Sequence, residues 1–469
     1  MPTPTSQTHA EPTRRVLMVA FYFPPDGGGG TQRTLKFCRY LPSFGWSPVV
    51  LAPPPRDATS QWTPRDDSLL AEVGPDLRVE RVPIGGAPTG WAAGLARIDE
   101  AHDWLEPAAD AAEELVDRLG CEAVVVSLGP FDLGYLGRRL AERLDVPVVL
   151  DLRDPWALDG ARVHSSKHAW QVHRDAMAAT CRAVDAVIAN TPGARAAIES
   201  AFPGLSVATR LDTITNGFDS ADFPDRQPVE PPSPAEDAPM TLVHAGTFHA
   251  RQGAGQRGLK GLLRSFVRYQ PEPADLSGRT PLHLLDAIER LREQGHPLGR
   301  RVRLEQLGVV DDALRRLVEG HPAGDAVDLV GYVDHAEATR RVSAADALFL
   351  PLHGLPPGHR SRIVPGKLYE YLAAGRPILG ALPEGDARDW LIDSGMGEAA
   401  PPTDPAAIAD ALIRLDEGRR AGRYADGPDP AWLDRFDRRR LTGALAALLN
   451  TLAAGSSATP RAASRGGRS

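Results

Sequence analysis

Short apolar runs recur along the chain and alternate with stretches of helical spacing. The runs lie, in chain order, at residues 16–21, 49–52, 77–82, 123–127, 146–150, 183–189, 240–248, 302–307, 327–330, 347–350 and 378–379. A short apolar run of this kind is typical of a strand buried on both faces of a parallel sheet. Helical spacing follows several of them, as at residues 133–144 and 282–294. The alternation predicts an α/β protein.

The length of the chain and one change of composition predict two domains. A chain of 469 residues is too long for a single hydrophobic core. A stretch rich in proline and acidic residues separates the two sets of strands and has the composition of a linker. We therefore expect two Rossmann-like β/α/β domains with a cleft between them. The predicted order is a disordered leader (1–13), a first domain (14–222), the linker (223–239), a second domain (240–430) with an insertion (252–280), a C-terminal helical segment (431–453) and a disordered tail (454–469).

Composition excludes several classes of protein. The formal net charge of −8 argues against a nucleic-acid partner recognised through basic charge. The three cysteines, Cys38, Cys121 and Cys181, are too few and too scattered for a disulfide framework or a zinc site. We expect a reducing, cytoplasmic location. The leader has no apolar centre and is not a signal peptide, and no run is long enough to span a bilayer.

A run of four glycines, Gly27, Gly28, Gly29 and Gly30, follows the first predicted strand and precedes a helix. A strand, a glycine loop and a helix in this order bring backbone N–H groups and a helix N-terminus to an anionic group. The run has neither the lysine of a P-loop nor the spacing of a dinucleotide fingerprint. The alternative is a flexible turn with no ligand, although four glycines in a row cost backbone entropy.

Charged residues also gather at the predicted ends of later strands. The strand at residues 146–150 ends in Asp151-Leu-Arg-Asp-Pro-Trp156, which contains Arg153 and Asp154. Polar residues at successive strand ends of a doubly wound sheet face one crevice. The alternative is a local ion pair between Arg153 and Asp154. The Gly- and Arg-rich insertion has two interpretations, a lid or partner contact and a disordered segment.

A single carboxylate, Glu370, lies in a short predicted helix near the end of the second domain. Pro365 and Gly366 precede the helix, and Gly375 ends it. A helix beside a parallel sheet is where ligands of open α/β sheets bind. Taken alone, Glu370 is equally compatible with an ordinary surface glutamate.

Several segments resemble one branch of the retaining nucleotide-sugar glycosyltransferases of the GT-B fold, family four (glycosyltransferase group 1). They occur in the family's order over roughly residues 14 to 395. The segments are Val16 to Gly30, Asp151 to Trp156, Ala189-Asn-Thr-Pro192, Thr215-Asn-Gly-Phe218, Gly331-Tyr-Val and Pro365-Gly-Lys-Leu-Tyr-Glu-Tyr-Leu-Ala-Ala-Gly-Arg-Pro377.

The resemblance implies transfer of a sugar from a nucleotide-diphosphate sugar with retention at the anomeric carbon, without a required metal or cofactor. The family's ribose-binding carboxylate falls on Glu370, whose two oxygens suit a diol. Its phosphate-binding residue falls best on Arg251, with Lys260 as a second basic partner. The resemblance places the diphosphate beside Pro365, Gly366, Lys367 and Leu368, with the four glycines lining the opposite side of the cleft.

Two departures from the family pattern concern the chemistry of transfer. Many members carry a glutamate eight positions before the ribose-binding one, where this chain has Arg362. That leaves the contact with the sugar open, and Arg362 is assigned to phosphate instead. Many members also have a histidine where this chain has Pro130-Phe-Asp132. Asp132 and Asp154 are the candidates for a polar catalytic role, beside Arg251.

We therefore expect a glycosyltransferase of polysaccharide, glycoconjugate or specialised-metabolite assembly. The alternatives are a nucleotide-sugar 2-epimerase of the same fold and a non-catalytic nucleotide-binding scaffold. Neither the base and sugar of the donor, UDP or GDP among them, nor the acceptor follows from the sequence. A peripheral contact with the inner face of a membrane is compatible with it if the acceptor is lipid-linked.

Overall fold

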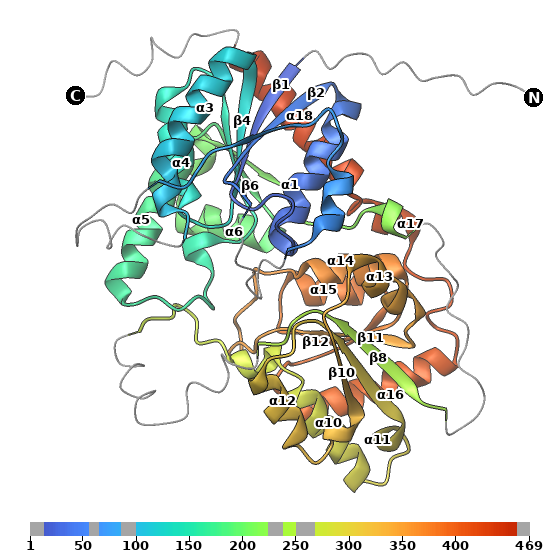
Figure 1. Ribbon diagram of the computed structural model, residues 1–469. Coiled ribbons are helices and arrows are strands. Elements are labelled where there is room, and N and C mark those ends of the chain that lie inside the picture. The colour runs from blue at the N-terminus through green and yellow to red at the C-terminus, as the bar shows by residue number, and fades with distance from the viewer. Residues whose placement is uncertain (1–13, 56–64, 86–99, 224–237, 250–267, 457–469) are drawn as a thin grey trace, which may run out of the picture.

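The structure is a computed structural model that describes residues 14–55, 65–85, 100–223, 238–249 and 268–456. It has two domains, each built on a parallel sheet with helices on both faces (Figure 1). The first sheet has the strand order β3-β2-β1-β4-β5-β6-β7, and the second has the order β10-β9-β8-β11-β12-β13. The predicted pair of Rossmann-like domains is confirmed.

The strands match most of the apolar runs, with shifts of a few residues at their ends. In the first domain they are β1 (Arg14–Ala20), β2 (Trp46–Ala52), β3 (Arg78–Arg81), β4 (Cys121–Leu128), β5 (Val148–Leu152), β6 (Ala186–Ala189) and β7 (Arg210–Thr213). In the second they are β8 (Met240–Ala245), β9 (Val302–Leu307), β10 (Val327–Gly331), β11 (Ala347–Pro351), β12 (Ile378–Ala381) and β13 (Gly397–Ala400).

The helices connect these strands and cover the sheets. Those of the first domain are α1 (Gly29–Tyr40), α3 (Leu105–Leu119), α4 (Leu133–Arg143), α5 (Lys167–Ala183), α6 (Pro192–Ala201) and α7 (Leu205–Ala208). Those that follow are α10 (Leu282–Glu293), α11 (Leu298–Arg301), α12 (Asp312–Glu319), α13 (His335–Ala344), α14 (Gly366–Ala374), α15 (Asp386–Asp393), α16 (Pro405–Arg420), α17 (Pro430–Asp434) and α18 (Arg438–Ser456).

Strand β1 shows why a continuous apolar run is needed in the first sheet. Val16 and Met18 lie in the core layer that α1 and α18 cover, and Leu17 and Val19 lie in the opposite layer under α3 and α4. All four side chains are almost fully buried. Successive residues of a strand point to opposite faces, so a strand with helices on both sides is apolar at every position.

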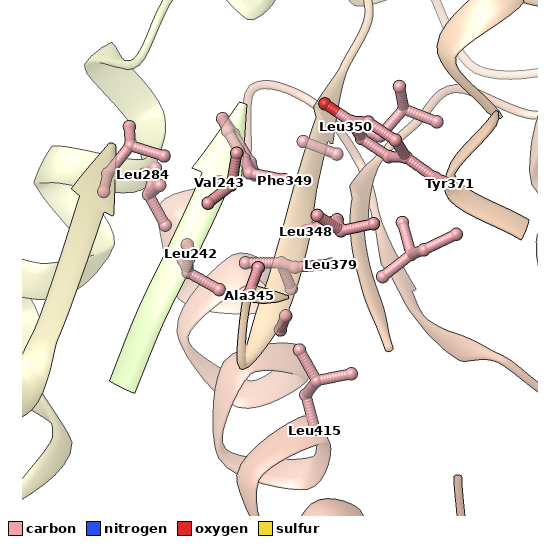
Figure 2. Close-up of a cluster of buried hydrophobic side chains, with 14 of the residues drawn as sticks. Leu242, Val243, Leu284, Ala345, Leu348, Phe349, Leu350, Tyr371, Leu379 and Leu415 are labelled. Carbon is pink, nitrogen blue, oxygen red and sulfur yellow. The ribbon is translucent and has the colours of Figure 1, made fainter. Parts of the chain in front are cut away.

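The second domain has one core, which fixes α14 against the end of the sheet. Leu242, Leu348 and Leu379 come from three neighbouring strands and lie together beneath Tyr371 of α14 (Figure 2). The Tyr371 hydroxyl accepts a hydrogen bond of 2.8 Å from the backbone N–H of Ala245, the last residue of β8. This contact holds α14 beside the carboxyl end of β8.

The chain crosses between the domains twice, and the two crossings are hydrogen-bonded to each other. Phe218 donates its N–H to the carbonyl of Phe436 at 3.1 Å, and Arg438 donates to the carbonyl of Phe218 at 2.9 Å. Helix α18 then packs on the first domain, beside α1 (Figure 1). It runs to Ser456, three residues into the segment that the sequence predicts as a tail. The predicted C-terminal helical segment therefore completes the first domain's core.

Arg33 of α1 joins the glycine loop's helix to the first crossing. Its guanidinium forms an ion pair of 2.7 Å with Asp151, and both side chains are 1% exposed. It also donates to the carbonyls of Ile214 and Thr215, at 2.8 and 2.6 Å. A buried arginine needs such a full set of acceptors, because an unpaired buried charge is strongly destabilising.

We predict that Asp151→Asn lowers the stability of the first domain by about 3–5 kcal/mol, since Arg33 then stays buried without its counter-charge. In a thermal melt this loss corresponds to a fall of about 10 °C in Tm. Glu199→Gln is the control, because its exposed pair with Arg195 has a similar 3.1 Å contact and is worth only about 0.5 kcal/mol or less. Equal melting of the two variants would contradict the role given to Arg33.

Candidate functional site

The first part of the candidate site lies where β1 and β4 end. These strands are neighbours in the middle of the first sheet, although other strands separate them in sequence to either side. Such a switch point leaves a crevice outside the carboxyl ends of the strands. Gly28, with a φ of +86°, is the N-cap of α1, and as a glycine it offers no side-chain oxygen to the first N–H groups of that helix. This arrangement suits an anion or a polar ligand.

The Arg153 side chain is hydrogen-bonded to the last residue of the glycine loop and to the end of β4. Its guanidinium donates to the carbonyl of Leu128 at 3.1 Å and to the carbonyl of Gly30. A Cβ at Gly129 would overlap this guanidinium, so Gly129 lets the arginine pass. The ion pair with Asp154, which the sequence left as an alternative, does not form in the described structure. Arg153 instead joins the first turn of α1 to the ends of β4 and β5.

The loop after β5 contains a strained residue. Trp156 has a φ of +47°, a backbone conformation that a bulky side chain rarely adopts. Its ring is buried and lies parallel to that of Phe131, with centroids 6.3 Å apart. Such outliers cost about 1–3 kcal/mol and occur mostly at functional sites.

The Asp154 carboxyl is close to charged side chains of its own domain, Arg153 and Asp159, and to Arg279 of the second domain. Burial, with a smaller contribution from Asp159, raises the pKa of its carboxyl to about 6, although Arg153 and Arg279 oppose the shift. The other predicted aspartate, Asp132, is fully buried beneath the first domain's surface, with His102 Nδ1 at 3.8 Å from its carboxylate. Asp154 is therefore the one of the two that lies at the domain junction.

The second part of the site lies where β8 and β11 end, at the switch point of the second sheet. Lys367, in the first turn of α14, lies against Gly246, which follows β8 with a φ of +154°. Any side chain at Gly246 would overlap this lysine. Burial lowers the pKa of the Lys367 ammonium, and the nearby charge of Arg279 lowers it further, while Glu370 raises it.

Arg279 comes from a short helical turn, η6 (Leu276–Arg279), and was not among the residues selected from the sequence. Burial lowers the pKa of its guanidinium, and Asp159 and Asp154 of the first domain counteract the shift. Its charge also acts on Lys367 and on His353, which follows β11 and is 2% exposed. Burial lowers the pKa of His353 to about 3, with Arg279 adding to the shift, so this imidazole is neutral.

Glu370 completes the group from the second turn of α14. Its carboxylate interacts electrostatically with Lys367, His335 and Arg438. Within the described residues, Glu370, Lys367 and Arg279 form no hydrogen bond or ion pair through their charged groups. These three side chains keep their donors and acceptors for a ligand.

The other residues predicted from the sequence are not part of the group formed by Glu370, Lys367 and Arg279 in the described structure. Pro365 is the N-cap of α14, Gly366 is exposed and Leu368 is buried under the helix. Arg251 and Lys260 lie outside the described residues, as does most of the predicted insertion. Arg362 does not face Lys367: it donates to the carbonyl of Leu158 and pairs with Glu272, both at 2.8 Å.

Arg279 and Asp159 were missed in the sequence for different reasons. Arg279 falls within the segment interpreted as an insertion, although Ser277-Gly278-Arg279 directly precedes a predicted helix. That position, just before α10, was the available signal. Asp159 follows the charged loop by three residues and carries no pattern of its own.

Two family models match the chain. A glycosyl transferase 4-like domain matches residues 28–217, and a model of glycosyl transferases group 1 matches residues 280–417. The chain belongs to the group 1 glycosyltransferases of the GT-B fold. It is accordingly an enzyme of sugar transfer. Comparison with curated proteins gives no significant match.

Solved structures agree with this glycosyltransferase fold over nearly the whole chain. Sucrose-phosphate synthase from Thermosynechococcus elongatus is 16% identical, with 94% of this chain and 100% of that chain covered and a TM-score of 0.63. Anabaena HepE in complex with UDP-glucose is 14% identical, with coverages of 93% and 100% and a TM-score of 0.58. A putative UDP-N-acetylglucosamine 2-epimerase from Listeria monocytogenes is 12% identical, with coverages of 94% and 96% and a TM-score of 0.53. At these identities the likeness concerns the fold.

Within the described ranges, no three His, Cys, Asp or Glu side chains gather in a way that would hold a metal ion. In the same ranges, no helix combines the length and apolar character needed to cross a bilayer.

His335 gives this glycosyltransferase a pH-dependent contact between its domains. The ring Nε2 lies 3.5 Å from the Asp222 carboxylate. The hydrogen bond to Asp222, with help from Glu370, raises the pKa of His335 above its ordinary 6.5, although burial and Lys36 oppose the shift. The charged form is therefore favoured in the folded protein.

We predict that this contact stabilises the protein fully below about pH 6.5, the unfolded value, and is lost as the pH rises through the higher folded value. The difference in stability between wild type and His335→Gln should therefore shrink from pH 6 to pH 9. Its size is about 0.2–1 kcal/mol, since both side chains are partly exposed. Urea denaturation at several pH values measures it. A difference that grows with pH would contradict the assignment.

Proposed function

We propose that the protein transfers a sugar from a nucleotide-diphosphate sugar to an acceptor, with retention of the anomeric configuration, at the junction of its two domains. The observation that carries the proposal is the convergence of Glu370, Lys367 and Arg279 at the β8–β11 switch point, with charged groups that no described residue pairs. Two cations and one carboxylate in this arrangement match a diphosphate and the ribose beside it.

The electrostatics favour a bound diphosphate. Lys367 and Arg279 are close enough to lower the pKa of the lysine, which means that their charges repel in the empty site. A diphosphate between them turns this repulsion into attraction for both groups. The same cations stabilise the additional negative charge that the diphosphate acquires when the bond to the sugar breaks.

Glu370 is proposed to hold the ribose. A carboxylate accepts hydrogen bonds from both hydroxyl groups of a diol. Lys367, one helical turn earlier, is then on the phosphate side. Arg251 and Lys260 remain predictions for further phosphate contacts. The backbone from Pro365 to Leu368 is next to the diphosphate in this arrangement.

The acceptor is proposed to bind on the first domain, between the glycine loop and Asp154. With a pKa of about 6, the Asp154 carboxyl is largely ionised at neutral pH and accepts a hydrogen bond from an acceptor hydroxyl. The departing diphosphate oxygen is the other acceptor for the proton in a retaining transfer. Asp132 stays a sequence prediction. A polysaccharide, glycoconjugate or specialised metabolite is the acceptor class that the family resemblance supports.

UDP is the first nucleotide to test, because the similar Anabaena structure holds UDP-glucose. We predict that Glu370→Ala and Arg279→Ala each weaken UDP binding by about 10- to 100-fold, the loss of about 1.5–3 kcal/mol for a hydrogen bond to a charged group. Calorimetric titration with UDP and with uridine separates their roles. Only Glu370→Ala should weaken uridine binding, since Arg279 contacts phosphate alone.

Arg251→Ala is the informative companion variant. If it abolishes UDP binding while Arg279→Ala leaves the affinity unchanged, the phosphate contact belongs to the residue chosen from the sequence. A substitution of exposed Asp325 by Asn serves as the control for altered surface charge, and its UDP affinity should equal that of wild type.

For the reaction itself, we predict slow release of nucleoside diphosphate from one donor of a UDP-, GDP-, ADP- and dTDP-sugar panel, with water as the default acceptor. Release should accelerate when a sugar-bearing acceptor is supplied, and the product should keep the donor's anomeric configuration by NMR. Glu370→Ala is the matched inactive control.

Other outcomes identify the alternatives. Isomerisation of the donor sugar without an acceptor would assign the protein to the 2-epimerases. Tight binding of a nucleoside diphosphate with no turnover of any donor would support a scaffold and contradict the transfer reaction.

A further inference from the structure

A segment of the second domain binds along the first domain. Residues 269–275, which we call the strap, precede η6 and α10 in the chain. Tyr269 pairs with His164 of the first domain through two backbone hydrogen bonds of 2.7 and 3.0 Å. Three residues later, the N–H of Glu272 donates to the carbonyl of Gly160 at 2.9 Å. The backbone of the strap is therefore hydrogen-bonded to the backbone of the segment that follows β5.

The other end of the strap is fixed to its own domain. Asp275 exchanges two backbone hydrogen bonds with Gly354, at 2.9 and 2.8 Å, and Gly354 follows β11. Only Pro273 and Ala274 separate this anchor from Glu272. Because three residue steps span at most about 11 Å, the domains cannot separate far at this edge without breaking one set of bonds.

Arg362 adds a side-chain connection at the same place. Its guanidinium binds the carbonyl of Leu158 and the carboxylate of Glu272, each at 2.8 Å. Its own carbonyl accepts a hydrogen bond of 3.3 Å from the Thr191 hydroxyl of the first domain. Both members of the ion pair are largely buried, with 29% and 18% of their side chains exposed. The glutamate side chain lies directly over Gly160, where a Cβ would overlap it.

The connection ends at the proposed phosphate-binding residue. Arg279 lies four residues beyond Asp275, and it faces Asp154 and Asp159 across the domain junction. The loop that carries these two aspartates also provides Leu158 and Gly160 to the strap and Arg362. One loop thus sets the position of the first-domain carboxylates and of the strap that leads to Arg279.

We propose that Arg362 and Glu272 are positioning residues for sugar transfer: by fixing the strap to the loop after β5, they hold Arg279 and the donor diphosphate in line with Asp154. Neither side chain contacts the donor, because their charged groups are engaged with each other and with Leu158. The proposal rests on the transfer function proposed above.

Detachment of the strap should affect sugar transfer but not donor binding. Glu370, Lys367 and Arg279 all belong to the second domain, so the donor keeps its contacts when the strap detaches. What changes is the distance between the sugar and the acceptor side of the first domain. A displacement of about 1 Å at a reacting centre can cost about 100-fold in rate. The expected signature is a loss of kcat with little change in donor KM.

The test compares Glu272→Gln and Arg362→Gln with wild type in the full-length protein. Each variant removes the ion pair and keeps a side chain of similar shape. We expect kcat to fall by about 10- to 100-fold and the donor KM to change less than about threefold. Hydrogen exchange should accelerate about tenfold or more at the amides of Tyr269, His164 and Glu272, and not in the cores of the two sheets.

Two further variants make the result specific. Asp325→Asn removes an exposed ion pair with Arg292 in the same domain (2.7 Å) and should leave both measurements unchanged. Gly160→Ala keeps every charge but displaces the Glu272 side chain, and should reproduce the loss of kcat. Arg362→Lys, which retains the charge and one hydrogen bond, should recover part of the lost rate.

Three outcomes would overturn the proposal. Unchanged exchange and kcat in both glutamine variants would mean that the strap does not tie the domains. Faster exchange with unchanged kcat would leave the contact a purely structural one. A donor KM that rises in proportion to the loss of rate would make Arg362 or Glu272 a donor ligand. If wild-type protein transfers no sugar from any donor, the positioning role fails together with the proposed function, and the exchange data still show whether the strap joins the domains.

Discussion

The buried guanidinium of Arg33 is the interaction on which the geometry of the domain junction depends. A charge that is almost completely removed from water must find all its partners inside the protein, and these partners fix its surroundings. Arg33 takes its acceptors from β5, through Asp151, and from the crossing segment, through Ile214 and Thr215. The helix behind the glycine loop, the strand before Asp154 and the first connection to the second domain are thereby held by one side chain.

The charges on the two sides of the junction are complementary. The first domain contributes the carboxylates of Asp154 and Asp159, and the second contributes the cations of Arg279 and Lys367. Burial makes each of these charges less favourable, so they depend on one another in the absence of a ligand. A diphosphate would take over the cations and leave Asp154 free to act on an acceptor. Under the proposed function, donor binding would change the charges around Asp154 in this way without any change of fold.

Most of the fold could be predicted from the sequence because its strands are buried on both faces. Runs such as that of β9 (Val302–Leu307) have no other easy explanation, and the structure places that strand at the predicted residues. Helix α5 was missed because its first half, from Lys167, is polar and partly exposed and shows no apolar stripe. Strand β13 was missed because Gly397-Glu-Ala-Ala400 has no β-branched residue and lies at a sheet edge.

The candidate site was less predictable because it is assembled across the two domains. Glu370 and Lys367 could be found from the local signature of α14, in which helix capping and family resemblance coincide. Arg279 could not be found in the same way, since residues 246–278 separate it in the sequence from the end of β8. A pattern that relies on sequence distance from β8 instead selects Arg251. A local motif can be recognised whatever the length of the neighbouring segments, whereas the spacing between two motifs changes with that length.

Position 362 holds an arginine where the family resemblance led us to expect a glutamate, and the contacts of this loop differ accordingly. A glutamate there, as in many relatives, would meet the carboxylate of Glu272 and the carbonyl of Leu158, and all three groups would repel one another. An arginine makes two favourable contacts in the same environment, with the Leu158 carbonyl and the Glu272 carboxylate, and binds the strap to the first domain. Both partners of the Arg362 side chain are hydrogen-bond acceptors, so a cation suits this position better than the carboxylate that the resemblance led us to expect there.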